Sequence, residues 1–309
     1  MNLLFATNPR SGLGLVSIGL PIVMFLVLSL VAPKFFSFEN LGNVSNQITA
    51  LLIVTLGQMI VALVAGIDIS VGSVVSLTSV IVVSVDPEIA IPMAVLAGLA
   101  VGLVNGFGVV VAGVHPLIMT LASMTFLQGF ALLIQTGAGG TVPSYIQRLS
   151  TGTFLGLPMS IVWSIIVVAI VSFIIYRTRF GLRMFAIGAN ARNVELSGVR
   201  TTWPRILCYV LCSLSGVLAG VYLTGRIATG DPMMGQSFSL DSVTAVALGG
   251  VQLADGTGSV LGAVFGSLTL GLITNGMNLL GISPFFRGAL TGLLLVGAIS
   301  LQRRKAIGI

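Results

Sequence analysis

The chain is a series of long apolar segments separated by short turns rich in glycine, proline and charged residues. An apolar segment of about 20 residues can cross the hydrocarbon layer of a bilayer as a helix. Only helices and closed barrels satisfy their backbone groups there, and the alternating pattern of barrel strands is absent. The pattern therefore predicts an all-α polytopic membrane protein with about ten crossings, at residues 13–32, 47–66, 70–85, 89–112, 117–135, 159–176, 205–224, 240–253, 258–280 and 285–301.

The lengths of three segments bear on how they lie in the membrane. The third (70–85) and the eighth (240–253) are short, so we expect them to be tilted, broken or re-entrant. The first is too long for a secretory signal and lacks a small-residue cleavage site. We therefore expect the first segment to remain in the membrane.

The composition supports the same class of protein. Hydrophobic residues make up 56% of the 309 residues and charged residues only 7%, with a mean hydropathy of +1.11. A soluble domain carries roughly 25% charged residues, so lipid must solvate most of this surface. We expect a single transmembrane domain over 1–309, with six crossings in 1–176, a cytoplasmic loop at 177–204 and four crossings in 205–309.

Few residues are available for catalysis or for cofactor binding. The chain has one histidine, His115, two lysines and no phosphate-binding loop of the form G-x-x-x-x-G-K-[ST], so it cannot hydrolyse ATP by itself. Cys208 and Cys212 stand four apart in an apolar segment and are interpreted as small core residues without a metal. We expect no enzymatic activity, no cofactor and no nucleic-acid partner.

The basic residues predict the orientation in the membrane. Cytoplasmic loops carry an excess of Lys and Arg. The four on the opposite face are Lys34, Arg148, Arg226 and Arg287, and the other ten of the 14 share one face with both termini. Both termini and loop 177–204 are therefore expected in the cytoplasm, with 136–158 and 225–239 outside.

Two segments of the chain resemble each other. The run 102–116 (GLVNGFGVVVAGVHP) is echoed by 271–284 (GLITNGMNLLGISP), and each lies near a ladder of glycines spaced by four. They belong to the fourth and ninth crossings, which run in opposite directions. Inverted five-helix repeats are a common transporter construction, and the alternative is chance in a chain with 39 glycines. Packing is the favoured role of the ladders, which are Gly98, Gly102 and Gly106, and Gly258, Gly262 and Gly266.

Several polar residues are predicted at membrane depth. Asp68 lies between two apolar segments, close to Ser70 and Ser73, and Asp255 precedes the ninth crossing. A carboxylate there is costly, which points either to a substrate or proton site or to a helix N-cap; the cap is favoured. His115 is interpreted as a turn or interface residue, and no chain of intramembrane Asp, Glu, His or Lys accompanies it, which counts against a proton-driven carrier.

Loop 177–204 contains a predicted docking element. Asn190 can cap a short helix at 191–197, and Gly198 suits the left-handed position that ends it. So short a helix is marginal alone, and we expect it to be stabilised by its own bundle or by a groove in another protein. The candidate anchors are Phe180, Leu182, Phe185, Val194 and Leu196.

Six short stretches together resemble the permease subunits of bacterial ABC importers of the ribose/xylose/galactose type. The resemblance covers about 38–301. It departs at Ala65, where glycine is usual, and at 254–255, which leaves the substrate subgroup open. The stretches are 65–73 (AGIDISVGS), 185–190 (FAIGAN), 196–199 (LSGV), 245–250 (AVALGG), 258–262 (GSVLG) and 278–284 (NLLGISP).

This resemblance implies a bacterial inner-membrane permease that pairs with a second copy or a related permease. The further partners are two cytoplasmic ATP-binding subunits and a periplasmic or lipid-anchored solute-binding protein. The loop 177–200 would carry the helix that couples the permease to the ATPase. The residues expected there are Phe180, Leu182, Arg183, Phe185, Asn190, Arg192, Glu195, Leu196 and Gly198.

On the outer face, Arg148, Arg226 and Arg287 are expected to contact the solute-binding protein. A monosaccharide is the expected solute. The alternatives are a nucleoside or branched-chain amino-acid permease of the same superfamily and, in a different class, a stand-alone secondary carrier or channel.

Overall fold

The computed structural model describes residues 12–253 and 256–301, which form twelve helices and one small hairpin. Six of these helices, α2, α4, α5, α7, α9 and α11, are long and apolar enough to cross a membrane. The protein is therefore a multi-pass membrane protein. The elements are α1 (Gly12–Val31), α2 (Phe38–Ala62), α3 (Val71–Ser84), α4 (Pro87–Val110), α5 (Pro116–Ile134), α6 (Ser144–Thr151), β1 (Thr153–Phe154), β2 (Leu157–Pro158), α7 (Met159–Arg177), α8 (Arg179–Leu196), α9 (Thr202–Ile227), α10 (Phe238–Leu248), α11 (Val260–Leu279) and α12 (Pro284–Leu301).

Each predicted apolar segment contains a helix, but some lengths differ from expectation. The second begins at Phe38 because the Ser37 side chain caps it by accepting from the Asn40 N–H (3.2 Å). The eighth, α10, has only 11 residues. At 1.5 Å per residue it covers about half of the hydrocarbon thickness. Helix α6, the hairpin β1–β2 and the first part of α8 were not predicted.

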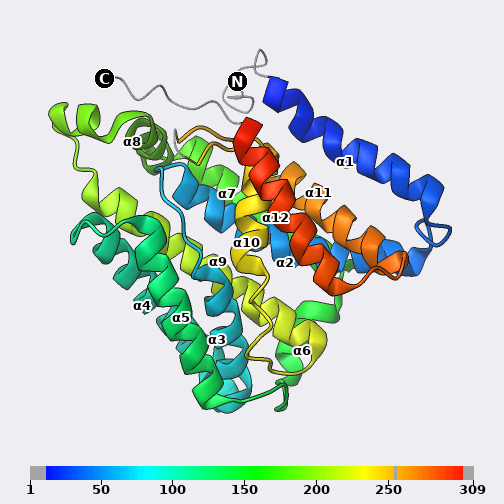
Figure 1. Cartoon of the computed structure of the whole chain (residues 1–309). Helices are drawn as coiled ribbons and strands as arrows, with labels where there is room; N and C mark the ends of the chain where they lie inside the picture. Colours follow the sequence, from blue (N-terminus) through cyan, green and yellow to red (C-terminus); the bar gives the residue numbers. More distant parts are fainter. Residues whose placement is uncertain (1–11, 254–255, 302–309) are drawn as a thin grey trace.

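The helices α2 and α9 form the centre of the bundle. They are the longest, with 25 and 26 residues, and pack against each other. Helices α3 and α4 pack against α9, whereas α10 and α11 pack against α2. The main apolar cluster draws on both central helices. Helix α1 lies on the outside, beside α11 (Figure 1). The centre is thus screened from lipid by the surrounding helices.

The two glycine ladders lie at close helix contacts, as predicted. A Cβ added at Gly102 would lie 2.5 Å from the Cα of Val210 on α9, and one added at Gly266 would collide with the Ala245 carbonyl on α10. Close backbone contact replaces the hydrophobic drive that lipid removes. The ladders pack against different partners, because the first faces α9 and the second faces α10.

Helices α8 and α6 lie at opposite ends of the bundle (Figure 1). At the α6 end, Gly225 of α9 packs so closely on α6 that an added Cβ would lie 2.5 Å from the Ile146 carbonyl oxygen. Gly139 and Gly230 pair there through two backbone hydrogen bonds of 2.8 and 2.9 Å. This end contains the loops that the charge distribution assigns to the outside.

Candidate translocation and coupling sites

Helix α8 consists of two helical segments joined at Asn190. Asn190 has an extended backbone (φ −165°, ψ 96°), and its side-chain oxygen accepts from the Asn193 N–H (3.0 Å). Gly198 is left-handed (φ 79°). The predicted short helix with its cap and glycine end is confirmed. The preceding segment, missed from the sequence, is capped by the Thr178 hydroxyl, which accepts from the Gly181 N–H (3.2 Å).

Only part of the predicted anchor set on α8 is free to contact another protein. Phe180, Phe185 and Val194 pack against the core of their own bundle. Leu182 and Leu196 are 72% and 79% exposed. Exposed polar neighbours of these leucines are Arg183, Arg192 and Glu195, and Glu195 accepts a hydrogen bond from the Thr201 hydroxyl. The surface available to a partner is therefore two leucines among charged groups.

The opposite side of α8 rests directly on the bundle at Gly188. A Cβ added at Gly188 would collide with the Leu63 carbonyl, which follows α2, and would lie 2.6 Å from the Cα of Gly256, which precedes α11. Nearby, the Tyr176 hydroxyl at the end of α7 accepts from the Val260 N–H (3.1 Å). A displacement of α8 therefore acts on the loops before α3 and α11 through backbone contact.

Asp68 lies in the turn between α2 and α3. It is fully buried, and its Oδ1 accepts from the Ser70 N–H (3.0 Å) and hydroxyl (2.6 Å). Ser70 makes no side-chain capping bond to α3. Asp68 thus stabilises the turn that enters α3. Ser73, one turn along, donates to the Met124 carbonyl on α5 (2.9 Å).

Other helices complete a polar centre around this turn, which we call the Asp68 junction: Gln58, Asp68, Ser70, Asn105, Ser123 and Tyr209. Asn105 of α4 donates to the Ser70 hydroxyl (2.8 Å) and accepts from Ser123 of α5 (2.5 Å). The Gln58 amide pairs with the Asp68 backbone, donating to its carbonyl (2.8 Å) and accepting from its N–H (3.2 Å).

Two polar atoms of this junction have no hydrogen-bond partner among the described residues: Asp68 Oδ2 and the Tyr209 hydroxyl. Both residues are at most 1% exposed. Sequence reasoning missed Gln58, Asn105, Ser123 and Tyr209 as parts of this site. The repeated Asn-Gly pair pointed to Asn105, but Tyr209 stands in an apolar helix with no distinguishing pattern.

The remaining predicted residue at membrane depth, Asp255, lies outside the described residues. Helix α11 starts at Val260, after Ser259, whose side chain accepts from the Gly262 N–H (3.0 Å). The start of this helix is therefore capped by a serine four residues after the predicted carboxylate.

The three arginines expected on the outer face have different surroundings. Arg287 pairs with Asp241 of α10 (2.6 Å), and Arg226 donates to the Asn46 carbonyl (3.3 Å). Arg148 on α6 is exposed, with a long contact of 3.5 Å to Ser144. Of the three, Arg148 is the one most available to a partner protein.

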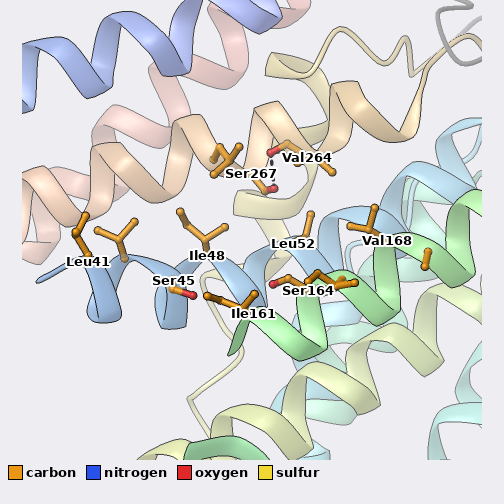
Figure 2. Close-up of a pocket in the computed structure, with 13 residues that line it drawn as sticks. Leu41, Ser45, Ile48, Leu52, Ile161, Ser164, Val168, Val264 and Ser267 are labelled. Atoms are coloured by element: carbon orange, nitrogen blue, oxygen red, sulfur yellow. Dashed lines mark hydrogen bonds between the residues drawn. The ribbon is translucent and has the colours of Figure 1, made fainter. Parts of the chain in front are cut away.

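A cleft of about 610 Å³ lies between α2, α7 and α11. Figure 2 shows Ser45, Ser164 and Ser267 among aliphatic side chains. The first two hydroxyls are bonded between α2 and α7, Ser45 to Ser160 (2.9 Å) and Ser164 to Thr49 (3.0 Å). The cleft therefore presents a mainly aliphatic surface, which does not suit a polar solute.

The family model and the individual proteins that resemble this chain all describe permeases. Residues 40–299 match the family described as the permease component of branched-chain amino acid transport systems. The chain is 33% identical over 292 residues to the ribose import permease protein RbsC of Bacillus subtilis, covering 92% of this chain and 91% of that protein. The L-arabinose permease AraH of Escherichia coli is 32% identical over 295 residues (92% and 88%), and its D-allose permease AlsC is 28% identical over 291 residues (92% and 89%). No solved structure matches the chain.

The Asp68 junction gives a prediction on stability. Asp68→Ala leaves the buried N–H and hydroxyl of Ser70 without their acceptor, which costs about 1–3 kcal/mol. Asp68→Asn keeps the accepting oxygen and places its NH₂ where Oδ2 has no partner among the described residues. Thermal unfolding of the purified protein in detergent should show a lower Tm for the alanine variant and a nearly unchanged Tm for the asparagine variant. Equal losses in both would contradict the role of Oδ1.

Proposed function

The chain belongs to the family of permease components of branched-chain amino acid transport systems, and we propose that the solute it conducts is a monosaccharide. As a permease subunit of an ABC importer it is a transport component, not an enzyme, and it works with an ATPase and a solute-binding protein. The observation that carries the sugar assignment is the similarity over nine-tenths of the chain to proteins named for ribose, arabinose and allose transport.

The other readings have less support. The family description names branched-chain amino acids, but the similar proteins cited above are named for sugars. A nucleoside permease has no specific support among them. A stand-alone carrier or channel is disfavoured because those relatives are permeases of ABC importers.

For the architecture, we propose ten crossings arranged as two inverted repeats, α1–α5 and α7 with α9–α12. In order, the helices have 20, 25, 14, 24 and 19 residues in the first half and 19, 26, 11, 20 and 18 in the second. A left-handed alanine follows the second helix of each half, Ala65 (φ 56°) and Ala228 (φ 57°). The packing is also reciprocal, with α3 and α4 on α9 and with α10 and α11 on α2. These parallels support a common ancestry of the halves.

For the assembly, we propose a single transmembrane domain (1–176, 177–204 and 205–309) in the bacterial inner membrane, with both termini cytoplasmic. Two permeases, identical or related, would join two ATPase subunits at α8 and one solute-binding protein at the outer face. The position of α8 at the end of the bundle opposite α6 supports this arrangement. When the ATPases close, they would push α8 against the loops at Leu63 and Gly256.

The energy source is the test of the proposed function. Vesicles containing the permease, its ATPase and its solute-binding protein should accumulate monosaccharide only with ATP, and collapse of the proton gradient should leave uptake unchanged. Accumulation by the permease alone, without nucleotide, would exclude an ABC importer. Uptake of leucine but not of ribose, arabinose or allose would exclude the sugar assignment.

Docking of the ATPase at α8 predicts that Leu182→Ser and Leu196→Ser each weaken its association with the permease. Burial of a leucine contributes about 1.5–3 kcal/mol, so each substitution should lower the affinity about tenfold or more. Titration of the ATPase onto the reconstituted permease measures the change. Leu155→Ser is the control, because Leu155 is 89% exposed in the hairpin at the other end of the bundle. Unaltered affinity in both α8 variants would place the ATPase contact elsewhere.

Receptor docking at the outer face predicts that Arg148→Glu slows the encounter with the solute-binding protein. Exposed charges act mainly on association rates and are screened by salt. At low ionic strength the variant should therefore have a higher KM for the solute-binding protein than the wild type. At high ionic strength the two KM values should be equal. A KM unchanged at low ionic strength would remove Arg148 from the interface.

A further inference from the structure

A polar pocket lies between α2, α9, α10, α11 and α12. Its volume is about 290 Å³, and its polar lining is Gln47, Arg226, Ser237, Thr274, Asn278 and Arg287. Ser237 precedes α10, Arg287 lies in the first turn of α12 and Asn278 lies in the last turn of α11, so the pocket lies at the outer ends of these helices. In a chain with only 7% charged residues, this convergence of two arginines, two amides and two hydroxyls is unusual.

The chemistry of this pocket fits a neutral polyhydroxylated solute. The charge of Arg287 is balanced by Asp241, which is 5% exposed on its side chain, and Arg226 donates to the Asn46 carbonyl. Gln47 and Asn278 carry amides, which both donate and accept hydrogen bonds, as a sugar hydroxyl does. Met234 and Phe238 supply apolar surface for the carbon skeleton. The volume of about 290 Å³ lies just below the usual range of about 300–1,000 Å³ for small-molecule sites.

The corresponding helices of the other repeat, α3, α4 and α5, form a polar centre with α2 and α9 at the opposite end of the bundle. In the inverted repeat, α10, α11 and α12 correspond to α3, α4 and α5, and α2 and α9 exchange places. The helices around the pocket thus correspond to those that meet at the Asp68 junction. Ser237 before α10 corresponds to Ser70 before α3. By the repeated Asn-Gly pair, Asn275 of α11 corresponds to Asn105 of α4, but Asn275 pairs with Asn40 of α2 and lies outside the pocket lining.

The two centres differ in whether they are open. The outer one is hollow. The inner one is closed around Asp68 Oδ2 and the Tyr209 hydroxyl, which have no hydrogen-bond partner among the described residues. Leaving buried polar atoms unpaired costs free energy, which is recovered when they meet water or solute hydroxyls. Such atoms favour a second state in which the inner centre opens.

We propose that the pocket is an outer station for the sugar on its path, and that the Asp68 junction is the equivalent inner station in its closed form. This inference rests on the proposed function, since the ligand class is the solute of that transport. Loading of the outer station and opening of the inner one would then alternate as α8 moves the loop that contains Asp68.

Thiol protection tests the outer station in the assembled importer in vesicles. Asn278→Cys places a thiol in the pocket, while the native Cys208 and Cys212 are fully buried and stay unlabelled by a membrane-impermeant maleimide. Ribose, arabinose or allose at millimolar concentration should slow the labelling at position 278 several-fold. Gln236→Cys, exposed on the same outer loop but outside the pocket lining, is the control and should label at an unchanged rate.

Each other outcome overturns the assignment of the pocket. Equal labelling with and without sugar removes the outer station, and slowing at both positions indicates general closure. Slowing by acetate but not by sugar assigns the pocket to a carboxylate. Ser237→Cys gives the same measurement if Asn278→Cys fails to assemble. ATP-driven sugar uptake without protection would remove only the pocket, whereas loss of ATP-driven sugar uptake by the wild type would remove the proposed function.

A pair of tyrosine variants tests the inner station. Tyr209→Phe removes a hydroxyl without a partner among the described residues, so it should keep or raise the Tm while lowering the rate of ATP-driven uptake several-fold. The KM for the solute-binding protein should stay unchanged. Tyr222→Phe removes a hydroxyl bonded to the Asn46 side chain (3.1 Å) and should lower the Tm instead. An unchanged uptake rate for Tyr209→Phe would exclude the Asp68 junction from the path.

Discussion

Every backbone polar group within hydrocarbon needs a hydrogen-bond partner in the protein, and this constraint decides where a membrane-spanning chain can interrupt its helices. In the turn after α2, a side chain supplies the hydrogen bonds that the backbone needs. The backbone N–H and C=O of Asp68 are both paired by the side-chain amide of Gln58, which lies in the last turns of α2, ten residues earlier in the chain. Helix α9 covers the same turn, with Tyr209 lying against Gly66. The irregular segment is therefore stable only inside a ring of helices, and the ring makes it a natural place for a polar path.

Packing between helices in lipid must come from close contact, because lipid is as apolar as the side chains it would replace. This explains why α4 meets α9 through Gly102, at a distance that leaves no room for a side chain. The same type of contact occurs at Gly188, where α8 meets the backbone at Leu63 and Gly256. A contact between backbones has no flexible side chain to absorb a displacement. Force applied to α8 is consequently transmitted to the turn that contains Asp68 and to the start of α11.

The sequence predicted the apolar helices well because their signal is length and hydropathy, both local properties. The cap at Asn190 was also predictable, since a capping side chain bonds a residue three positions on. Contacts between residues far apart in the sequence gave no such local signal. Asn105 bonds Ser70 and Tyr209 lies against Gly66, and neither proximity follows from spacing. Burial likewise separated Leu182 from Phe180, neighbours that look equally suited to docking in the sequence. The elements in the loops, α6 and the hairpin, are short and owe their form to packing on α9 and α7.

The scarcity of charge along the proposed path fits the task of a conduit. A solute must enter a site readily and leave it quickly, so tight binding at any one point slows the flow. In the one ion pair among the described residues, the charges of Arg287 and Asp241 neutralise each other. The other polar groups at both ends are mainly amides and hydroxyls. Such groups replace the water around a sugar without holding it strongly. Selection of the solute can then be left to a separate binding protein, while the permease supplies two weak sites whose opening depends on the position of α8.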